Sequence, residues 1–461
     1  MSLAITILAA GKGTRMKSRL PKVLQPLAKR PLLQHVLETA QQLKPEKILP
    51  VIGHGADRVK QQIQQDNLCW VLQTEQLGTG HAVQQVLPFL STEDQLLILY
   101  GDVPLIQAET LQDLLSLLDE QHPLALLTVN LDSPQGYGRI IRDQHLNVMA
   151  IVEEKDATLA QKQVQEVNTG IMAVSAGALT KWLSALSNDN AQGEYYLTDI
   201  IAMAVAEGFH IRTTQPISAS EVLGVNDKLQ LQQLERVYQS QQAERLMDAG
   251  VTLMDVDRLE VRGSVQVGQD VEIDVNVILE GQVVLEDGVK VGANCILKNC
   301  HIGADTLIEP FSHIEDSDIG QACIIGPYAR LRPGTELAAS VKIGNFVETK
   351  KAQIGQGSKV NHLSYIGDTQ MGKNCNIGAG TITCNYDGVH KHQTIIGDEV
   401  FVGSDTQLVA PVALGEGAII GAGSTITKAV PAYELTLSRA KQVTIKGWKK
   451  STNSLSKGQK D

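Results

Sequence analysis

The sequence predicts an α/β protein made of two dissimilar parts: an N-terminal Rossmann-like domain with a mostly parallel sheet, and a C-terminal left-handed parallel β-helix of hexapeptide repeats. Two observations lead to this prediction. Over the first half of the chain, short apolar segments alternate with helical patterns, which is typical of a parallel sheet covered by helices. Over most of the second half, apolar residues recur every six positions, which is the repeat of a β-helix.

The overall composition limits the kinds of function. The chain has 461 residues, enough for several domains with buried cores. Its formal net charge of −11 argues against binding of nucleic acid and offers no basic face for a membrane surface. No apolar run approaches the roughly 18 residues of a membrane span, and no basic segment precedes the first apolar run, so we expect neither a membrane protein nor a secretory signal.

The six cysteines are scattered without Cys-x-x-Cys pairs. This spacing favours buried thiols in a reducing, cytoplasmic environment over a disulfide framework or a zinc site. They are Cys69, Cys295, Cys300, Cys323, Cys375 and Cys384.

Strand and helix patterns alternate through the first half. Strands are expected over residues 3–8, 47–52, 96–100, 124–129, 148–153 and 168–174. Helices are expected over residues 31–43, 56–65, 79–87 and 108–119. Because ligands of such sheets bind at the carboxyl ends of the strands, the loop after the first strand and Asp102, after the third, are expected at one site.

A loop of small residues with two cations follows the first strand. Residues 9–15 read AAGKGTR. Small side chains allow backbone N–H groups to approach an anion, and Lys12 and Arg15 supply positive charge, so phosphate is the expected ligand. The spacing matches neither a Walker A loop nor GxGxxG, and an ordinary glycine turn is the alternative that the loop alone leaves open.

Three further motifs follow in order: LPKVL at 20–24, QTEQLGTGHA at 73–82, and an apolar strand that ends in GDVP at 101–104. Together with the loop they resemble the nucleotidyltransferases that make nucleotide sugars from sugar 1-phosphates. This resemblance implies that Asp102 holds Mg²⁺, with Asn226 as the second ligand. Carboxylate oxygen suits that ion, although a turn or helix-capping role is the alternative for a lone Asp.

Other motifs are similar to those of the nucleotidyltransferases that act on N-acetylglucosamine 1-phosphate. They are GYGRI at 136–140, VEEKD at 152–156 and VNTGI at 167–171. The resemblance implies that the sugar phosphate attacks the α-phosphorus of UTP and releases pyrophosphate, while Arg15, Lys22 and Mg²⁺ stabilise charge. The substrate-binding residues that it implies are Leu8, Ala9, Ala10, Gly11, Lys22, Gln73, Gly78, Thr79, Tyr100, Gly101, Asp102, Gly138, Glu153, Asn168 and Asn226. Among these, Gln73, Gly78 and Thr79 fall on the uracil-contacting motif.

A long helix is expected between the two parts. Residues 226–249 contain no Gly or Pro, Leu231, Leu234 and Tyr238 have helical spacing, and Gly250 follows. The predicted domains are therefore 1–226 and 251–461, joined by a helical linker at 227–250. A coiled coil is the alternative, but the apolar spacing is too short-lived for one.

The six-residue period keeps its phase through several series of apolar residues. The first contains Val267, Ile273, Leu279, Leu285, Val291 and Leu297. After a five-residue step come Ile302, Ile308 and Ile314, and then Ile319, Ile325, Leu331, Leu337 and Ile343. The last contains Ile396, Val402, Leu408, Leu414, Ile420 and Ile426. These side chains are expected to point into a prism in which three hexads make one coil.

One interruption separates Thr383 from Ile396 by thirteen residues, and such an excursion from a solenoid often carries a binding function. The inserted segment reads CNYDGVHKH from Cys384, and NHLSYIGD at 361–368 and NIGAGT at 376–381 precede it. These motifs resemble the hexapeptide acyltransferases, which transfer acetyl from acetyl-CoA to an amine.

Over essentially its whole length the chain resembles the bifunctional N-acetylglucosamine-1-phosphate uridyltransferase/glucosamine-1-phosphate acetyltransferases of bacteria. The resemblance implies that His362 is the general base of acetyl transfer, and a neutral imidazole suits that role near pH 7. It implies that Arg332 and Lys350 bind the sugar phosphate and that Tyr365 and Asn376 hold the sugar. The implied acetyl-CoA residues are Ala379, Asn385, Tyr386, Ser404, Ala422 and Arg439.

The same resemblance implies a cytoplasmic homotrimer, associated through the β-helix, that supplies UDP-N-acetylglucosamine for cell-wall precursors. The basic tail from about residue 447 is expected to be mobile, and Lys446, Lys449 and Lys450 either touch the 3′-phosphate of CoA or are only solvated.

Two alternatives remain at this point. One is a sugar-nucleotide pyrophosphorylase with a single activity and a regulatory hexapeptide domain, which His362, Asn385 and Tyr386 disfavour. The other is a non-catalytic assembly subunit, which the intact Lys12 and Asp102 disfavour together with the other phosphate-binding cations.

Overall fold

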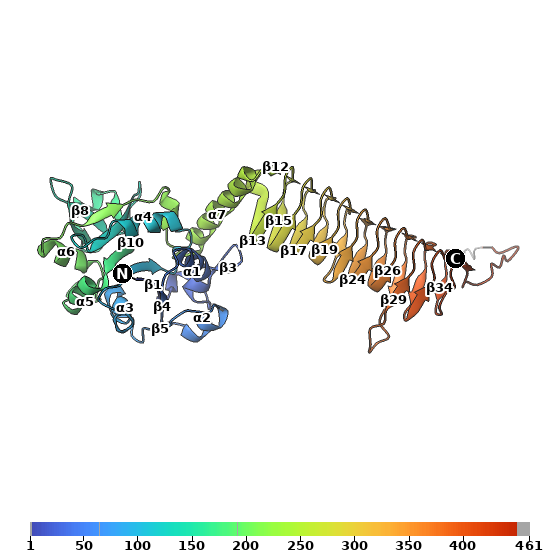
Figure 1. Ribbon diagram of the computed structural model, residues 1–461, viewed down its shortest axis with the longest axis horizontal. Coiled ribbons are helices and arrows are strands. Elements are labelled where there is room, and N and C mark those ends of the chain that lie inside the picture. Colours follow the sequence, from blue (N-terminus) through green and yellow to red (C-terminus); the bar gives the residue numbers. More distant parts are fainter. Residues whose placement is uncertain (1, 64, 191, 450–461) are drawn as a thin grey trace, which may run out of the picture. The chain divides into compact units, whose positions relative to one another are not determined.

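The computed structural model describes residues 2–63, 65–190 and 192–449, and Figure 1 shows its elements. Residues 450–461 of the predicted tail, Lys450 among them, lie outside the described residues. The chain divides into two compact units. The first comprises residues up to Arg245 together with Val261–Gly263, and the second comprises Leu246–Glu260 and the residues from Ser264 onward.

A nine-stranded sheet forms the centre of the first unit, in the order β11-β7-β10-β6-β1-β4-β5, with β8 beside β10 and β9 beside β8. The bounds of these strands are β1 Leu3–Ala9, β4 Lys47–Ile52, β5 Val71–Leu72, β6 Gln95–Tyr100, β7 Leu124–Asn130, β8 Arg139–Arg142, β9 Val148–Val152, β10 Glu166–Ser175 and β11 Arg212–Thr214. β1 is parallel to β4 and β6, whereas β10 is antiparallel to β6 and β7. The predicted, mostly parallel sheet is confirmed, with β10 running against its neighbours.

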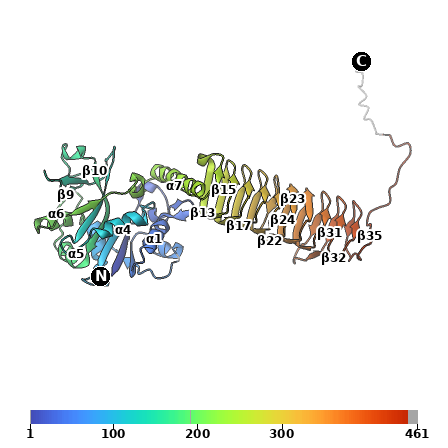
Figure 2. The same cartoon turned by 45° about the horizontal axis from the view of Figure 1, so that its top comes forward.

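Helices cover both faces of this sheet (Figure 2). α1 (Leu32–Gln42), α2 (Ala56–Gln62) and α4 (Ala108–Ser116) contribute to the apolar core on one face. α3 (Thr79–Gln84), α5 (Ala176–Ser184) and α6 (Asp199–Ala206) contribute to the core on the other. Residues of β1 enter both cores, which explains why that strand is apolar except at Thr6, whose hydroxyl donates to the carbonyl of Leu49.

The predicted long helix is α7, Lys228–Asp248. Its first half packs through Leu234 and Tyr238 against residues around a small hairpin, formed by β2 (Pro26–Leu27) and β3 (Arg30–Pro31). The ring of His35 meets Tyr238 edge-on, with 5.5 Å between their centroids. α7 therefore holds the residues just before it, including Asn226, against the core of the first unit.

The second unit is a parallel β-helix. One of its sheets contains β12 Thr252–Leu253, β14 Glu272–Ile273, β16 Lys290–Val291, β18 Leu307–Ile308, β20 Ile324–Ile325, β23 Lys342–Asn345, β25 Lys359–His362, β27 Asn376–Ile377, β30 Phe401–Val402, β33 Ile419–Ile420 and β35 Leu435–Thr436. The other contains β13 Leu259–Val267, β15 Val277–Leu285, β17 Ile296–Ile302, β19 His313–Ile319, β21 Arg330–Leu331, β22 Thr335–Leu337, β24 Glu348–Ile354, β26 Tyr365–Met371, β28 Ile382–Cys384, β29 Thr394–Ile396, β31 Gln407–Val409, β32 Val412–Leu414 and β34 Thr425–Ile426.

The six-residue period corresponds to inward-pointing side chains, as predicted. The apolar residues of the hexads are buried along the prism, apart from the half-buried Val267 of the first coil. Equivalent positions on successive coils are 17 or 18 residues apart, as in the hydrogen bonds from Asn276 to Asn294 and from Asn299 to Asp316. Three hexads therefore make one coil.

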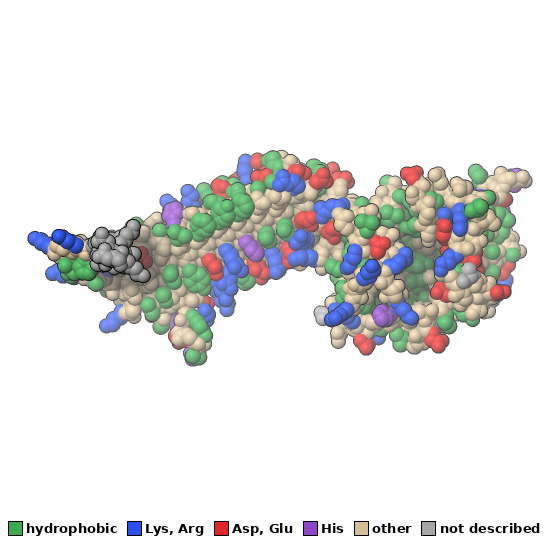
Figure 3. Space-filling model, turned by 180° about the vertical axis from the view of Figure 1, so that it is seen from behind, with side chains coloured by type: hydrophobic (Ala, Val, Ile, Leu, Met, Phe, Trp, Pro, Cys, Tyr) green, Lys and Arg blue, Asp and Glu red, His purple; other side chains and the backbone are tan. Residues whose placement is uncertain are grey.

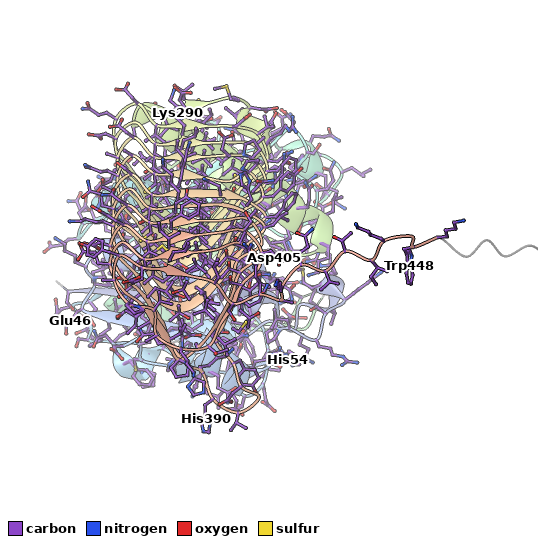
Figure 4. All side chains as sticks on the ribbon, turned by 90° about the vertical axis from the view of Figure 1, so that its right-hand side faces the viewer. Glu46, His54, Lys290, His390, Asp405 and Trp448 are labelled. Carbon is purple, nitrogen blue, oxygen red and sulfur yellow. The ribbon has the colours of Figure 1, made fainter. Side chains whose placement is uncertain are left out.

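The excursion leaves the β-helix between β28 and β29 (Figure 1). Across it, the backbone N–H of Lys373 bonds to Asp398, 25 residues later instead of 17 or 18. A bridge between Tyr386 and Lys391 closes the excursion into a small hairpin, and Figure 4 shows His390 at its tip, pointing away from the stacked coils. The coil therefore continues in register on either side of the insertion.

All six cysteines are unpaired, as predicted; four of them are buried as expected, whereas Cys69 and Cys384 are only partly buried. None of the helices in the described part of the chain is both long enough and apolar enough to cross a membrane. Figure 3 shows side chains of both charges interspersed on one face of the β-helix.

Candidate active sites

The first candidate site lies where the chain reverses its direction across the sheet. β1 lies between β4, which follows it in the chain, and β6, which is reached later from the other side. The loops after β1 and β6 therefore diverge at the carboxyl edge of the sheet, and such a divergence is the usual position of a ligand crevice. Leu8 and Ala9 end β1, Ala10 and Gly11 open its loop, and Gly101 follows β6.

Two cations, a carboxylate and an amide meet at this edge. The ammonium of Lys22 forms an ion pair with Asp102, and it donates to Oδ1 of Asn226 over 3.1 Å. The guanidinium of Arg15 donates to the same amide oxygen over 2.8 Å. The structure thus brings together four predicted site residues that span more than 200 positions of the sequence.

Gln73, Gly78 and Thr79 lie together beside the start of α3. The side-chain nitrogen of Gln73 donates to the carbonyl of Gly78 over 3.2 Å, and the hydroxyl of Thr79 accepts from the backbone N–H of Leu197 over 3.2 Å. Gly78 has a φ of +112°, and a Cβ there would lie 2.6 Å from the carbonyl oxygen of Tyr195, so only glycine fits.

The residues predicted to hold the sugar form another group. The backbone N–H of Asn168 donates to the carbonyl of Gly138 over 2.8 Å, and a Cβ at Gly138 would stand 3.4 Å from the carboxylate of Glu153. Glu153 accepts from the hydroxyl of Thr198 over 3.1 Å. Burial raises the pKa of Glu153, and the hydrogen bond from Thr198 offsets only part of that effect.

Tyr100 connects the sugar group with the cation cluster. Burial chiefly raises the pKa of its phenol, and the negative charges of Glu153 and Asp102 add to the effect. Both carboxylates therefore affect the same phenol, one from each group of predicted residues. Its ring also packs against Gly170, where a Cβ would clash with it.

The second candidate site follows one corner of the β-helix. A column of residues, one from each successive coil, is joined there by backbone hydrogen bonds. The carbonyl oxygen of each member accepts from the backbone N–H of the residue that directly follows the next member in the sequence, over 2.7–3.3 Å. At the end of the column the guanidinium of Arg439 donates to the carbonyl of Ala422 over 2.7 Å. The column consists of Asn345, His362, Ala379, Ser404 and Ala422. The predicted general base and three of the predicted acetyl-CoA residues therefore lie on successive coils, and a fourth, Arg439, contacts the last of them.

His362 is oriented by a residue one coil earlier. Its Nδ1 lies 3.0 Å from Oδ1 of Asn345. Because an amide oxygen only accepts, Nδ1 carries the hydrogen and Nε2 keeps its lone pair. Both residues line a surface groove with Lys342 and Asn361, and His362 is exposed there. The arrangement leaves the outer nitrogen able to accept a proton.

Arg332, Lys350 and Tyr365 lie on the neighbouring sheet. Arg332 forms an ion pair of 2.7 Å with Glu348, and its backbone N–H donates to the carbonyl of Thr349. Lys350 follows on the next coil, in β24, and Tyr365 begins β26. Asn376 lies instead in β27 of the other sheet, and within the described residues no contact joins it to these three. The structure thus gathers the predicted sugar-phosphate residues only in part.

The excursion carries the remaining predicted residues. The amide of Asn385 donates to Asp368 and lies 3.5 Å from the hydroxyl of Tyr365. The ammonium of Lys391 stands 4.5 Å from the ring centroid of Tyr386. Asn385 therefore joins the base of the excursion to β26, while Tyr386 remains exposed.

Several polar partners escaped the sequence analysis: Asn345, Glu348, Asp368, His81 and Thr198. The spacing of the coils is a signal that could have found three of them, since each lies about one coil from the predicted residue that it contacts. Asn345 and Asp368 lie 17 residues before His362 and Asn385, and Glu348 lies 16 residues after Arg332. No comparable period exists in the first unit, so His81 and Thr198 could be found only from the fold.

Together, the cluster at the carboxyl edge of the first unit's sheet and the column of the second unit are those of a nucleotidyltransferase joined to a hexapeptide-repeat transferase. Residues 5–248 match the family described as MobA-like NTP transferase domain, residues 261–344 that described as GMPPB C-terminal domain, and residues 393–428 that described as bacterial transferase hexapeptide, six repeats.

Curated relatives match almost the whole chain. Proteins named "Bifunctional protein GlmU" from Marinobacter nauticus and Azoarcus sp. are 59% and 57% identical over 97% of this chain, and they are covered to 98% and 99%. That of Acinetobacter baylyi is 57% identical over 96% of this chain and is covered to 97%. The chain belongs to the GlmU family of bifunctional enzymes. It joins a uridyltransferase to a glucosamine-1-phosphate acetyltransferase in UDP-N-acetylglucosamine synthesis, as its sequence predicts.

Proposed function

We propose that the cluster at the carboxyl edge of the first unit's sheet is the uridyl-transfer site, with Arg15 and Lys22 as the groups that stabilise charge on the phosphates of UTP. The observation that supports this role is the convergence of Arg15, Lys22, Asp102 and Asn226 on a few ångströms. Phosphoryl-group transfer requires positioning and positive charge rather than covalent help from the protein, and this cluster supplies both.

Asp102 and Asn226 are the proposed ligands of Mg²⁺. Both present an oxygen to a single cation, the ammonium of Lys22, so their geometry already suits a small positive ion. Hard oxygen ligands suit Mg²⁺, which usually takes only one or two from the protein and the rest from phosphates and water. When bound, the ion would neutralise charge on the triphosphate, while Lys22 would turn toward the phosphates.

Gln73, Gly78 and Thr79 are proposed to bind the uracil, and Gly138, Glu153 and Asn168 the N-acetylglucosamine. Glu153 would accept a hydrogen bond from a sugar hydroxyl once it is ionised. Since the charges of Glu153 and Asp102 both act on the phenol of Tyr100, the reacting phosphate is expected near its ring.

At the second site, the proposed general base is Nε2 of His362. It would take a proton from the amine of glucosamine 1-phosphate as that nitrogen attacks the thioester carbonyl of acetyl-CoA, and the thiol of CoA would leave. Asn345 keeps the hydrogen on Nδ1, so the lone pair is available. Arg332 and Lys350 would bind the phosphate, and Tyr365 and Asn376 the sugar.

The column of Ala379, Ser404 and Ala422 is proposed to hold the pantetheine arm. Its members are small and end at the guanidinium of Arg439, which suits an extended chain that carries phosphates. Asn385 and Tyr386 would contribute from the excursion, and Lys446 and Lys449 are candidates for the 3′-phosphate.

We also propose that the enzyme is a cytoplasmic homotrimer, associated through the β-helix. The groove at His362 is open in a single chain, and Arg332, Lys350 and Tyr365 do not line it. A neighbouring copy would bring such residues to a groove that they do not line within one chain.

An assay that follows both reactions tests the proposed sites. Wild-type protein receives glucosamine 1-phosphate and acetyl-CoA, and free thiol is measured; uridyl transfer is measured from ready-made N-acetylglucosamine 1-phosphate. We expect His362→Ala to lower thiol release by about 10²–10⁴-fold, the range of a lost general base, and to leave uridyl transfer unchanged.

His301 supplies the matched control. It lies on β17 and contacts Glu286 and Asp318, away from the His362 column, so His301→Ala should leave thiol release near the wild-type rate. Unchanged thiol release in His362→Ala would rule out His362 as the base. Absence of thiol release from the wild type would leave the pyrophosphorylase with a single activity.

A further inference from the structure

We propose that His81 is a positioning residue that fixes the orientation of the Gln73 amide and so makes the first site selective for uracil over cytosine. The inference rests on the proposed function, in which Gln73 contacts the base of the nucleotide. It adds a residue to that site and a reason for the choice of nucleotide.

The hydrogens of the Gln73 amide are both used inside the protein. Gln73 follows β5, and only 3% of it is exposed. Its Nε2 donates to the carbonyl of Gly78 over 3.2 Å and lies 3.1 Å from Nδ1 of His81. Within the described part of the chain, its Oε1 accepts no hydrogen bond from the protein. The amide oxygen is therefore the atom left for a ligand.

The two ends of a glutamine amide have nearly the same size and exchange by a half-turn, so hydrogen bonds must decide which end faces a ligand. The carbonyl of Gly78 can only accept, which draws the amide nitrogen toward it. Its position is held in turn by Tyr195, whose backbone N–H donates to Leu77 and whose carbonyl accepts from Gly80, each over 2.8 Å. The loop is therefore a fixed reference for the amide.

His81 supplies the second acceptor. A neutral imidazole has one nitrogen with a hydrogen and one without, and an amide nitrogen at 3.1 Å from Nδ1 requires that Nδ1 be the bare one. The hydrogen then lies on Nε2. The amide nitrogen of Gln85 stands 3.2 Å from that atom and donates to the backbone carbonyl of His81 over 3.2 Å, so a half-turn of the Gln85 amide would exchange that backbone bond for one accepted from Nε2–H. Gly78 and His81 together satisfy both hydrogens of the Gln73 amide.

This orientation distinguishes the two pyrimidines. Uracil carries a hydrogen on N3, whereas cytosine has a lone pair there. A fixed amide oxygen accepts from N3–H of uracil, but it meets N3 of cytosine lone pair to lone pair. A buried polar group left without its partner lowers affinity considerably, so a fixed acceptor discriminates more strongly than an amide that is free to turn.

The test compares UTP with CTP for wild-type enzyme, His81→Leu and His81→Asn. We expect His81→Leu to lower the ratio of kcat/KM for UTP to that for CTP by about tenfold, mainly through KM for the nucleotide, with KM for the sugar phosphate unchanged. Asparagine places an oxygen on Cγ, where histidine has Nδ1, so His81→Asn should restore most of the ratio. His145→Leu, in the exposed turn between β8 and β9, is the matched control and should behave as wild type.

Circular dichroism and thermal unfolding show whether each variant folds, and His81→Ala replaces His81→Leu if the larger side chain disturbs α3. A ratio within twofold of wild type in a folded His81→Leu, or no recovery in His81→Asn, would overturn the inference. Gln73→Ala separates a failure of the role proposed for His81 from a failure of the contact proposed between Gln73 and the base. If it loses selectivity while His81→Leu keeps it, only the role of His81 fails; if Gln73→Ala keeps selectivity, the proposed base contact fails as well.

Discussion

The two candidate sites are assembled in different ways. In the first unit, Arg15 and Asn226 meet across 211 positions because crossover connections bring separate loops to one edge of the sheet. In the second unit, His362 and Asn345 meet because they are one coil apart. The first site depends on the whole topology of its unit, whereas the second repeats a local step.

This difference affects how complete each site is within one chain. In the first site, the charges of Lys22 and Asp102 already neutralise each other, and Lys22 also donates a hydrogen bond to Asn226. The second extends along an exposed corner, and its predicted phosphate-binding residues lie on a neighbouring sheet. A crossover fold can surround a substrate, whereas a solenoid presents a surface that a second surface has to complete.

The largest expected effect is that of Lys22→Met on uridyl transfer. Loss of a cation that stabilises the phosphates should lower kcat by about 10²–10³-fold, with acetyl transfer unchanged. The ammonium of Lys22 also occupies the position proposed for the metal. In the absence of nucleotide, Lys22→Met should therefore bind Mn²⁺ more tightly than the wild-type enzyme does, as measured by electron paramagnetic resonance. Lys12→Met removes a cation from the loop at residues 9–15, which does not contain Lys22, and is the control. Equal Mn²⁺ affinities in Lys22→Met and Lys12→Met would contradict the shared position.

A core substitution in the β-helix tests the independence of the two units. Leu297 on β17 is fully buried between Leu279 and Ile314 on the adjacent coils. Leu297→Ala should lower the free energy of unfolding of the second unit by about 3 kcal/mol, the usual cost of such a cavity. Calorimetry should show this as a lower transition temperature, with uridyl transfer intact at 25 °C. The outward-facing Lys298→Ala should cost far less, and loss of uridyl transfer in Leu297→Ala would show that the units unfold together.

Much of the fold could be predicted because its patterns are local. The hexad residues are buried as expected, and β4 has the predicted bounds. The prediction omitted α6, because it is apolar on nearly all sides and shows no helical period, and β5, because it has only two residues. The antiparallel direction of β10 is decided by pairing partners far away in the sequence, and no local pattern reports it.

The candidate sites were less predictable from physical reasoning alone. Charge and small residues indicated a phosphate loop, but the separate roles of Lys22 and Asn226 followed only from a family resemblance, and the contact between them is seen only in the structure. Asn345 was within reach, since counting one coil back from His362 finds it. His81 was not, because its contact with Gln73 depends on how α3 follows a loop with a left-handed glycine.

Asn345→Ala sharpens the view that coil-to-coil contacts orient the base. Without the amide oxygen, either nitrogen of His362 can carry the hydrogen, and the ring can turn. We expect kcat for acetyl transfer to fall by about tenfold, which corresponds to one lost orienting hydrogen bond. Asn345→Asp keeps an acceptor and should retain more activity, with the acid limb of its pH profile moved upward by the added negative charge. Asn361→Ala, beside His362 in the same groove, is the control, and an equal loss there would assign the effect to the groove as a whole.

The smallest expected effect concerns the pH dependence of the first site, which the second should not share. Burial raises the pKa of Glu153, so the folded protein binds a proton there at a higher pH than the unfolded chain does. As the pH is lowered, KM for N-acetylglucosamine 1-phosphate should therefore increase by a few fold, and the increase should begin at a higher pH than the protonation of an ordinary glutamate would give.

The raised pKa of Glu153 also affects stability. This carboxyl contributes most to stability at low pH, and the contribution is lost as the pH rises through the folded pKa. Glu153→Gln should accordingly unfold at a higher temperature than wild type at neutral pH, and the difference should disappear in acid. Glu109→Gln on the exposed side of α4 should show neither effect.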